Sequence, residues 1–281
     1  MPTEVIPRIP DPVRKVVRNT IWASGRVTAR WRGLPDFLVI GAQKAGTTAL
    51  YAYLRWHPQI NGPFWKEISF FDRHWWRGEA WYRGQLPLRG EGKLVGEASP
   101  SYVFHPLGPE RVHSLVPNVR LIVLVREPAE RAYSHYQHEV ALGREPLSFE
   151  DALEAECERL DGEVERLQAD PRAFSRAWWD HAYVERGLYA DQLERWFGAF
   201  PREQVLVLTT DELGARPAET YATVLEFVGA SPHRLATYPR VFDRDYPPMQ
   251  PETRAALEAR FAEPNRRLEE LLGRSLGWPT S

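Results

Sequence analysis

The sequence predicts an α/β protein in which helices flank a central parallel sheet within a single domain. Short apolar runs of strand length alternate with longer amphipathic segments of helix length along most of the chain. The apolar runs are nearly continuous, which is typical of parallel strands that are buried on both faces. No repeat, low-complexity stretch or flexible linker divides residues 36–281. We therefore expect one domain there, preceded by a basic arm over residues 1–35.

The elements follow from these patterns in chain order. The arm contains one possible helix over residues 12–32, and the first strand is expected at 37–40, followed by a helix over 46–56. Pro128 opens a later helix, because proline suits the first helical position. Further strands are expected at 93–97, 119–125 and 204–208, and further helices near 149–168, 186–199, 217–229 and 251–272.

Composition narrows the functional classes. The 281 residues include 36 Lys and Arg against 38 Asp and Glu, which gives a formal net charge of −2. This balance argues against nucleic-acid binding through a generally basic surface. No apolar run reaches the about 18 residues of a membrane-spanning helix, and the N-terminus lacks a signal-peptide pattern. We therefore expect a cytoplasmic protein without an integral membrane segment, whose oligomeric state the sequence does not indicate.

The loop at 41–48, with the sequence GAQKAGTT, connects the first strand to the first helix. Backbone amides of such a loop converge on an anion, and the helix N-terminus adds about half a positive charge. Lys44 adds a full charge, and the hydroxyls of Thr47 and Thr48 can donate to phosphate oxygens. Lys44 stands three residues before the lysine position of a nucleoside-triphosphatase loop. This phosphate loop (residues 41–48) therefore suits one phosphate better than a triphosphate with magnesium.

A second anion site is expected after the strand at 119–125. That strand is followed by Arg126, whereas a magnesium-binding strand would end in an acidic residue. Ser134 follows eight residues later, just over two turns into the next helix. Arg126 and Ser134 can bind one phosphate together, with the guanidinium in bidentate contact. The spacing also allows an alternative in which Arg126 forms an ion pair at the start of the helix.

No metal site is expected. The single cysteine, Cys157, cannot form a disulfide within the chain, and the histidines do not show the spacing of zinc ligands. Residues 64–82 contain eight aromatic side chains. They suit stacking against a sugar or a flat apolar acceptor, and they equally suit packing in a core.

Six segments match a known family in order and spacing: 37–60, 66–72, 96–106, 120–136, 186–197 and 263–278. Together they resemble the sulfotransferases that use 3′-phosphoadenosine 5′-phosphosulfate (PAPS). The resemblance is strongest to the heparan sulfate N- and 3-O-sulfotransferase domains and their bacterial relatives. It implies that residues 36–281 form a sulfotransferase domain with a P-loop-like phosphosulfate-binding loop.

The resemblance also implies a role for each matching residue. Glu97 corresponds to the catalytic base, and Lys66 to a residue that lines the cleft near the acceptor. Arg126 and Ser134 correspond to the pair that binds the 3′-phosphate. The product of PAPS would be adenosine 3′,5′-bisphosphate, and the reaction would need no metal. The 5′-phosphosulfate would be bound by Lys44, Ala45, Gly46, Thr47 and Thr48, with Lys44 stabilising the leaving phosphate.

A C-terminal segment departs from the family pattern. Heparan enzymes carry Lys-Gly-Arg in a loop that closes over the nucleotide, whereas residues 242–244 are Phe-Asp-Arg. Arg244 is retained, and Arg240 is a candidate to replace the missing lysine. The single cysteine also excludes the disulfide that many 3-O-sulfotransferases have before this loop.

Three functional hypotheses follow. The first is a sulfotransferase that acts on a hydroxyl or an amine of its acceptor. The acceptor would be a carbohydrate or a small molecule such as a lipid or a natural product. The second is a nucleotide kinase or NTPase with an atypical phosphate loop. The third is a non-catalytic binding scaffold, against which Glu97 argues, because binding alone needs no base.

Overall fold

A parallel sheet of five strands forms the centre of the computed structural model, which describes residue 25, residues 27–239 and residues 246–280. The strand order is β2-β3-β1-β4-β5, and every neighbouring pair is parallel. This arrangement confirms the predicted α/β class. The strands are β1 (Phe37–Gly41), β2 (Ile60–Asn61), β3 (Leu94–Ala98), β4 (Arg120–Val125) and β5 (Val205–Thr209).

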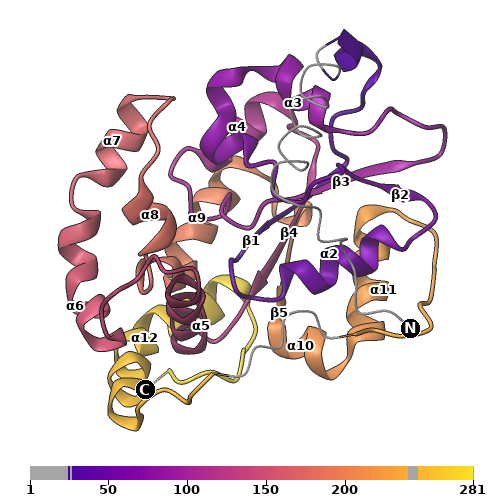
Figure 1. Ribbon diagram of the computed structural model, residues 1–281. Helices are drawn as coiled ribbons and strands as arrows, with labels where there is room; N and C mark the ends of the chain where they lie inside the picture. The colour runs from indigo at the N-terminus through magenta and orange to yellow at the C-terminus, as the bar shows by residue number, and fades with distance from the viewer. Residues whose placement is uncertain (1–24, 26, 240–245, 281) are drawn as a thin grey trace.

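Helices flank the sheet on either side, and α6, α7 and α8 gather at the left margin of Figure 1. None of the described helices is both long and apolar enough to cross a membrane. The α-helices are α2 (Thr47–Arg55), α3 (Glu79–Gln85), α4 (Gly108–Leu115), α5 (Pro128–Ala141), α6 (Phe149–Leu160), α7 (Glu163–Ala169), α8 (Arg176–Asp180), α9 (Tyr189–Ala199), α10 (Thr210–Ala215), α11 (Pro217–Val228) and α12 (Pro251–Leu272). Short helices of other types are η1 (Ala29–Trp31), η2 (Phe70–His74), η3 (Trp75–Arg77), η4 (Glu185–Gly187) and η5 (Arg202–Gln204).

The core lies on both faces of the central strands. The first four residues of β1 and the last five of β4 are fully buried, at 0% exposure. Burial on both faces explains why these strands are continuous apolar runs instead of alternating ones. Strand β2 was not predicted from the sequence, because two residues are too few to give a recognisable pattern. It is defined by its pairing with β3.

Two predicted helices are broken in the structure. The predicted helix at 149–168 is divided into α6 and α7, because Gly162 adopts a left-handed conformation with φ of 70°. The predicted helix at 186–199 begins as η4 and continues as α9 from Tyr189. The predicted helices at 217–229 and 251–272 are confirmed as α11 and α12. Most of the helix expected at 12–32 lies outside the described residues. In the described part, residues 25, 27 and 28 are α-helical and are followed by the short η1.

The parallel arrangement determines where a ligand site can form. All strands of a parallel sheet end at the same edge, and ligands of open α/β sheets bind beyond these carboxyl ends. The phosphate loop follows β1, Arg126 follows β4, and Thr210 follows β5. Glu97 is the fourth residue of β3 and lies opposite Leu38 of β1 in the register. The predicted site residues therefore meet at one edge of the sheet.

Candidate active site

The phosphate loop forms the expected strand–loop–helix connection between β1 and α2. Gly46 occupies the N-cap of α2 in a left-handed conformation, with φ of 90° and ψ of 8°, which favours glycine. The N-cap glycine has no side chain that could accept hydrogen bonds from the amides of the first turn of α2. Thr47 is buried and Thr48 half-buried in that turn. Such a helix start is suited to binding an anion.

Lys66 lies against this loop. Its Nζ donates to the Thr48 hydroxyl at 3.1 Å and forms an ion pair with Glu67 at 2.9 Å. The Lys66 side chain is only 16% exposed. The contact with Thr48 places a second cation, besides Lys44, beside the phosphate loop.

Glu97 is completely buried at the carboxyl end of β3, and three hydroxyl groups surround its carboxylate. Ser99 and Tyr102 donate to Oε1, at 2.5 and 3.4 Å. Tyr82 donates to Oε2 at 3.2 Å. These three donors fix the orientation of the carboxylate, as a positioned base requires.

The environment of Glu97 raises the pKa of its carboxyl group toward neutral pH. The pKa of Glu97 is raised to about 7, chiefly by burial. The negative charge of Asp72 acts in the same direction, and the hydrogen bonds from Ser99, Tyr102 and Tyr82 act in the opposite direction. Burial also raises the pKa of Asp72 to about 7, against the influence of the positive charges of Arg186 and Arg111. A general base is most effective when its pKa lies near the working pH, so the raised pKa of Glu97 is compatible with the role that the resemblance implies for it.

Arg126 forms an ion pair with Glu130 at 3.1 Å. Its guanidinium remains 26% exposed, and its backbone carbonyl accepts a hydrogen bond from the Tyr189 hydroxyl at 3.0 Å. Glu130 also forms an ion pair with Arg254. The structure therefore contains the ion pair that the alternative interpretation of Arg126 expected. Ser134 is buried on α5. That Arg126 and Ser134 bind one phosphate together remains a prediction.

Comparison with known proteins identifies the family. The family described as "Sulfotransferase domain" matches residues 34–241, which is well over half of the chain. The chain belongs to the sulfotransferase domain family. It is therefore a sulfotransferase, and this result sets aside the alternatives of a nucleotide kinase and of a non-catalytic scaffold.

Relatives of this sulfotransferase are known from animals and bacteria. The human protein named bifunctional heparan sulfate N-deacetylase/N-sulfotransferase 3 is 32% identical over 292 residues, which cover 92% of this chain and 32% of that protein. The mouse protein named bifunctional heparan sulfate N-deacetylase/N-sulfotransferase 4 is 32% identical, over 88% of this chain and 30% of its own length. The chain thus spans about a third of the length of these relatives.

A solved bacterial structure resembles the sulfotransferase along nearly its entire length. It is the crystal structure of a sulfotransferase from Alicyclobacillus acidocaldarius, at 32% sequence identity and a TM-score of 0.69. The match covers 87% of this chain and 98% of that one. The likeness confirms the sulfotransferase fold for the domain that carries Glu97 and the phosphate loop.

Half of the eight aromatic side chains at 64–82 belong to the buried core. Its four most deeply buried members pack around the strands near Glu97, and Phe70 stacks on Tyr82 with ring centroids 4.3 Å apart. Phe64 and Trp76 are exposed, at 65% and 45%. The core interpretation therefore holds for half of the eight side chains: Phe70, Phe71, Trp81 and Tyr82.

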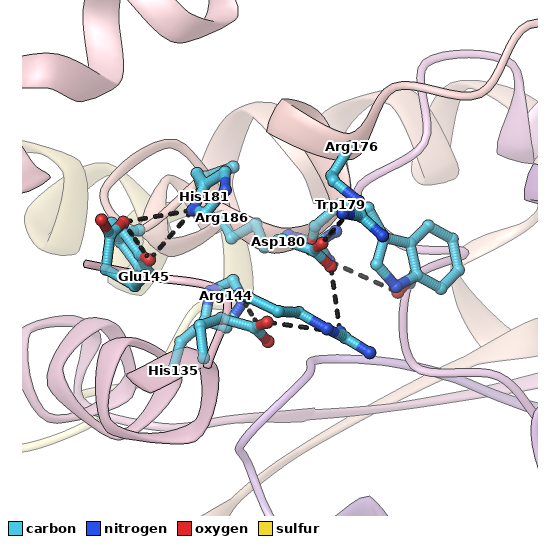
Figure 2. A network of polar contacts seen from close by, with 12 residues as sticks. His135, Arg144, Glu145, Arg176, Trp179, Asp180, His181 and Arg186 are labelled. Atoms are coloured by element: carbon cyan, nitrogen blue, oxygen red, sulfur yellow. Dashed lines mark hydrogen bonds and ion pairs between the residues drawn. The ribbon is translucent and has the colours of Figure 1, made fainter. Parts of the chain in front are cut away.

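A polar network around the buried carboxylates of Glu139 and Asp180 joins α5, which carries Ser134, to α8 (Figure 2). Arg144 bridges the carboxylates of Glu139 and Asp180, at 3.3 Å from each. Arg186 is 3% exposed and donates to the backbone carbonyl of Trp178 at 3.1 Å. The network thus fixes α8 relative to the helix that carries one of the predicted anion ligands.

The residues that surround the predicted ones were not predicted from the sequence. Ser99 and Tyr102 fall inside the matched segment 96–106 and follow the base by two and five positions, so their spacing contained a signal. Asp72 ends the matched segment 66–72, but nothing in the sequence indicates its influence on Glu97. Thr210 directly follows a parallel strand, where ligand sites occur. The predicted nucleotide ligands Arg240 and Arg244 lie outside the described residues.

Proposed function

We propose that this sulfotransferase transfers the sulfuryl group of PAPS to a hydroxyl or an amine of a carbohydrate, lipid or natural-product acceptor. The observation that carries the proposal is the buried carboxylate of Glu97 on β3, beside the strand that leads into the phosphate loop. Its raised pKa suits a general base. This arrangement brings a base and an anion-binding helix start to the same edge of the sheet.

The proposed reaction is an in-line transfer. The acceptor oxygen or nitrogen attacks sulfur while Glu97 takes the acceptor proton, and the bond between sulfur and the 5′-phosphate oxygen breaks. Lys44 neutralises the negative charge that grows on this oxygen. The products are the sulfated acceptor, adenosine 3′,5′-bisphosphate and protonated Glu97. As in phosphoryl transfer, positioning and charge stabilisation supply most of the rate enhancement.

Each of the two anion sites would bind a different group of the donor. Thr47, Thr48 and the amides at the start of α2 would hold the 5′-phosphosulfate. Arg126 and Ser134 would hold the 3′-phosphate, and Arg126 would exchange its ion pair with Glu130 for this phosphate. Both sites bear fixed positive charge, so no step in this scheme is assigned to a metal ion.

A thermal-shift titration tests the donor assignment. The protein is titrated with adenosine 3′,5′-bisphosphate, with AMP, and with ATP plus magnesium. A ligand at 100 times its Kd stabilises the folded state by about 2.7 kcal/mol, which gives a clear rise in Tm. We expect the bisphosphate to give the largest shift. A shift with ATP and magnesium but none with the bisphosphate would overturn the assignment of PAPS as donor.

The acceptor requires a separate assay. The relatives are named for heparan sulfate, and a carbohydrate amine or hydroxyl is one class within the proposal. Transfer of labelled sulfate from PAPS is measured with N-deacetylated heparan sulfate, a simple glycoside, a phenol and a lipid alcohol. Label incorporation into one class identifies the acceptor, and incorporation that disappears in Glu97→Gln assigns it to this site.

A further inference from the structure

Thr210 connects the two predicted anion sites. It is the first residue of α10 and directly follows β5 at the carboxyl edge of the sheet. Its hydroxyl donates to the carbonyl oxygen of Ala45 at 2.9 Å and to that of Val125 at 3.3 Å. Ala45 lies in the phosphate loop, and Val125 directly precedes Arg126. One half-buried hydroxyl, directly after β5, thus contacts both the last residue of β4 and the loop that follows β1, and these three strands are neighbours in the sheet.

We propose that Thr210 is a positioning residue that fixes the distance between the phosphate loop and Arg126, and thereby sets the affinity for a donor that carries both a 5′- and a 3′-phosphate. This inference rests on the proposed use of PAPS. Thr210 acts through the two backbone carbonyls. A ligand that spans both sites loses affinity when the sites can move relative to each other, because binding must then order them.

The helix that carries Thr210 is itself firmly held. Thr209 and Glu212 form a reciprocal capping box at the start of α10, with Thr209 Oγ1 accepting from the Glu212 amide at 3.0 Å. Arg274 forms an ion pair with Glu212 and donates to the Val207 carbonyl at 3.1 Å. The anchor of Thr210 is therefore rigid enough to position the loops that it contacts.

A second contact of α10 supports the same role. Leu213 lies one turn after Thr210 and packs against Gly46, where a Cβ would lie 3.4 Å from Leu213 Cδ2. Helix α10 thus contacts the phosphate loop at two adjacent residues, by a hydrogen bond to Ala45 and by packing at Gly46. Helix α10, which follows β5, therefore packs against the phosphate loop and supports it.

The test compares three variants of the full-length chain. Thr210→Val removes the hydroxyl at nearly constant volume, and Thr210→Ser retains it. Thr220→Val is the control, because the Thr220 hydroxyl likewise donates to two carbonyls, of Glu212 and Arg216, at 3.0 Å each, and Thr220 is buried more deeply than the half-buried Thr210. Neither of these carbonyls belongs to the phosphate loop or to Val125. Calorimetry measures the Kd of adenosine 3′,5′-bisphosphate and of AMP, and urea unfolding measures stability.

We expect Thr210→Val to weaken binding of the bisphosphate by about 3- to 10-fold, the effect of one lost hydrogen bond, and to weaken AMP binding less. Thr210→Ser and Thr220→Val should bind the bisphosphate like the unaltered chain, although Thr220→Val loses as much stability as Thr210→Val. Equal bisphosphate affinity in Thr210→Val and the unaltered chain would overturn the inference. If the unaltered chain itself does not bind the bisphosphate, the donor assignment fails instead.

Discussion

Lys66 Nζ donates to the Thr48 hydroxyl at 3.1 Å, which ties the segment after β2 to the phosphate loop. A hydroxyl that accepts from an ammonium group has its own proton free to point elsewhere. The positive charge of Lys66 also makes this hydroxyl a stronger donor toward an anion. We therefore expect Lys66, which the resemblance assigns to the acceptor side, to support the proposed donor site as well.

We expect Lys66→Met to weaken binding of adenosine 3′,5′-bisphosphate by about 10-fold, the scale of one hydrogen bond to a charged group. Glu67→Gln is the matched control, because it breaks the ion pair of Lys66 and leaves the contact with Thr48 in place. Its affinity should stay within about 2-fold of the unaltered chain. Calorimetry measures both values, and equal losses in the two variants would show that the ion pair, and not Thr48, matters.

Glu97→Gln should lower kcat by about 10²–10⁴-fold, because the amide cannot take the acceptor proton. Donor affinity should remain, since the Glu97 carboxylate accepts its hydrogen bonds from Ser99, Tyr82 and Tyr102 and not from the phosphate loop, within the part of the chain that the structure describes. Steady-state kinetics with labelled PAPS measure kcat, and calorimetry measures donor binding. Glu158→Gln, an exposed position on α6, is the control and should leave both unchanged. Near-full turnover in Glu97→Gln would disprove its role as base.

The activity should rise with pH through about 7, since Glu97 must lose its proton before it can accept another. Asp72 raises the pKa of Glu97 through its negative charge, so Asp72→Asn should move the rise toward lower pH. The profile of kcat/KM against pH measures the shift in both forms. A purely structural role of Asp72 would reduce activity at every pH and leave the position of the rise unchanged.

The framework of this site could be predicted because each part has a local signal. The strands at 37–40 and 119–125 are buried on both faces and are therefore recognisable as apolar runs. The phosphate loop and Arg126 directly follow these strands, so the parallel topology brings them to one edge. The helix boundary at Gly46 and the start of α5 at Pro128 follow from the conformational preferences of glycine and proline.

Two contacts of the site, those of Tyr82 and of Thr210, could not be predicted, because they join segments that are distant in the sequence. Tyr82 reaches Glu97 from α3, fifteen residues earlier, and Thr210 reaches Ala45 across 165 residues. Such pairs leave no periodic pattern in the sequence. The ion pair of Arg126 with Glu130 has the spacing of neighbours on a helix, yet spacing alone could not decide between this partner and a phosphate.

The stability of the protein should depend on pH through Glu97. The folded-state pKa of about 7 lies above the ordinary value of about 4.3 that we expect in the unfolded chain. Between these values the folded state binds more protons, so the contribution of Glu97 to the free energy of unfolding is full below about pH 4 and is lost as pH rises through 7.

Glu97→Gln removes this contribution. Between about pH 4 and 7, the unfolding free energy of the unaltered chain should fall relative to that of this variant by about 1.4 kcal/mol per pH unit. The variant therefore gains in relative stability as the pH rises. Urea unfolding at pH 5, 6, 7 and 8 measures it, with Glu158→Gln following the unaltered chain. Parallel curves for the unaltered chain and Glu97→Gln would mean that the carboxylate titrates normally and is not buried in solution.

Arg126→Gln tests the second anion site. Charge-assisted hydrogen bonds to a phosphate contribute about 1.5–3 kcal/mol, so the variant should bind adenosine 3′,5′-bisphosphate about 10- to 100-fold more weakly. AMP lacks the 3′-phosphate, and its affinity should not change. Calorimetry with both ligands separates a specific contact from a general loss of structure.

Glu130→Gln is the companion variant, because Glu130 is the ion-pair partner of Arg126 at 3.1 Å. Removing this carboxylate frees the guanidinium from its competitor, so bisphosphate affinity should be retained or should increase. If Arg126 instead serves only to hold the start of α5 through this ion pair, both variants should weaken bisphosphate and AMP binding alike. A loss confined to Arg126→Gln and to the bisphosphate assigns the 3′-phosphate to Arg126.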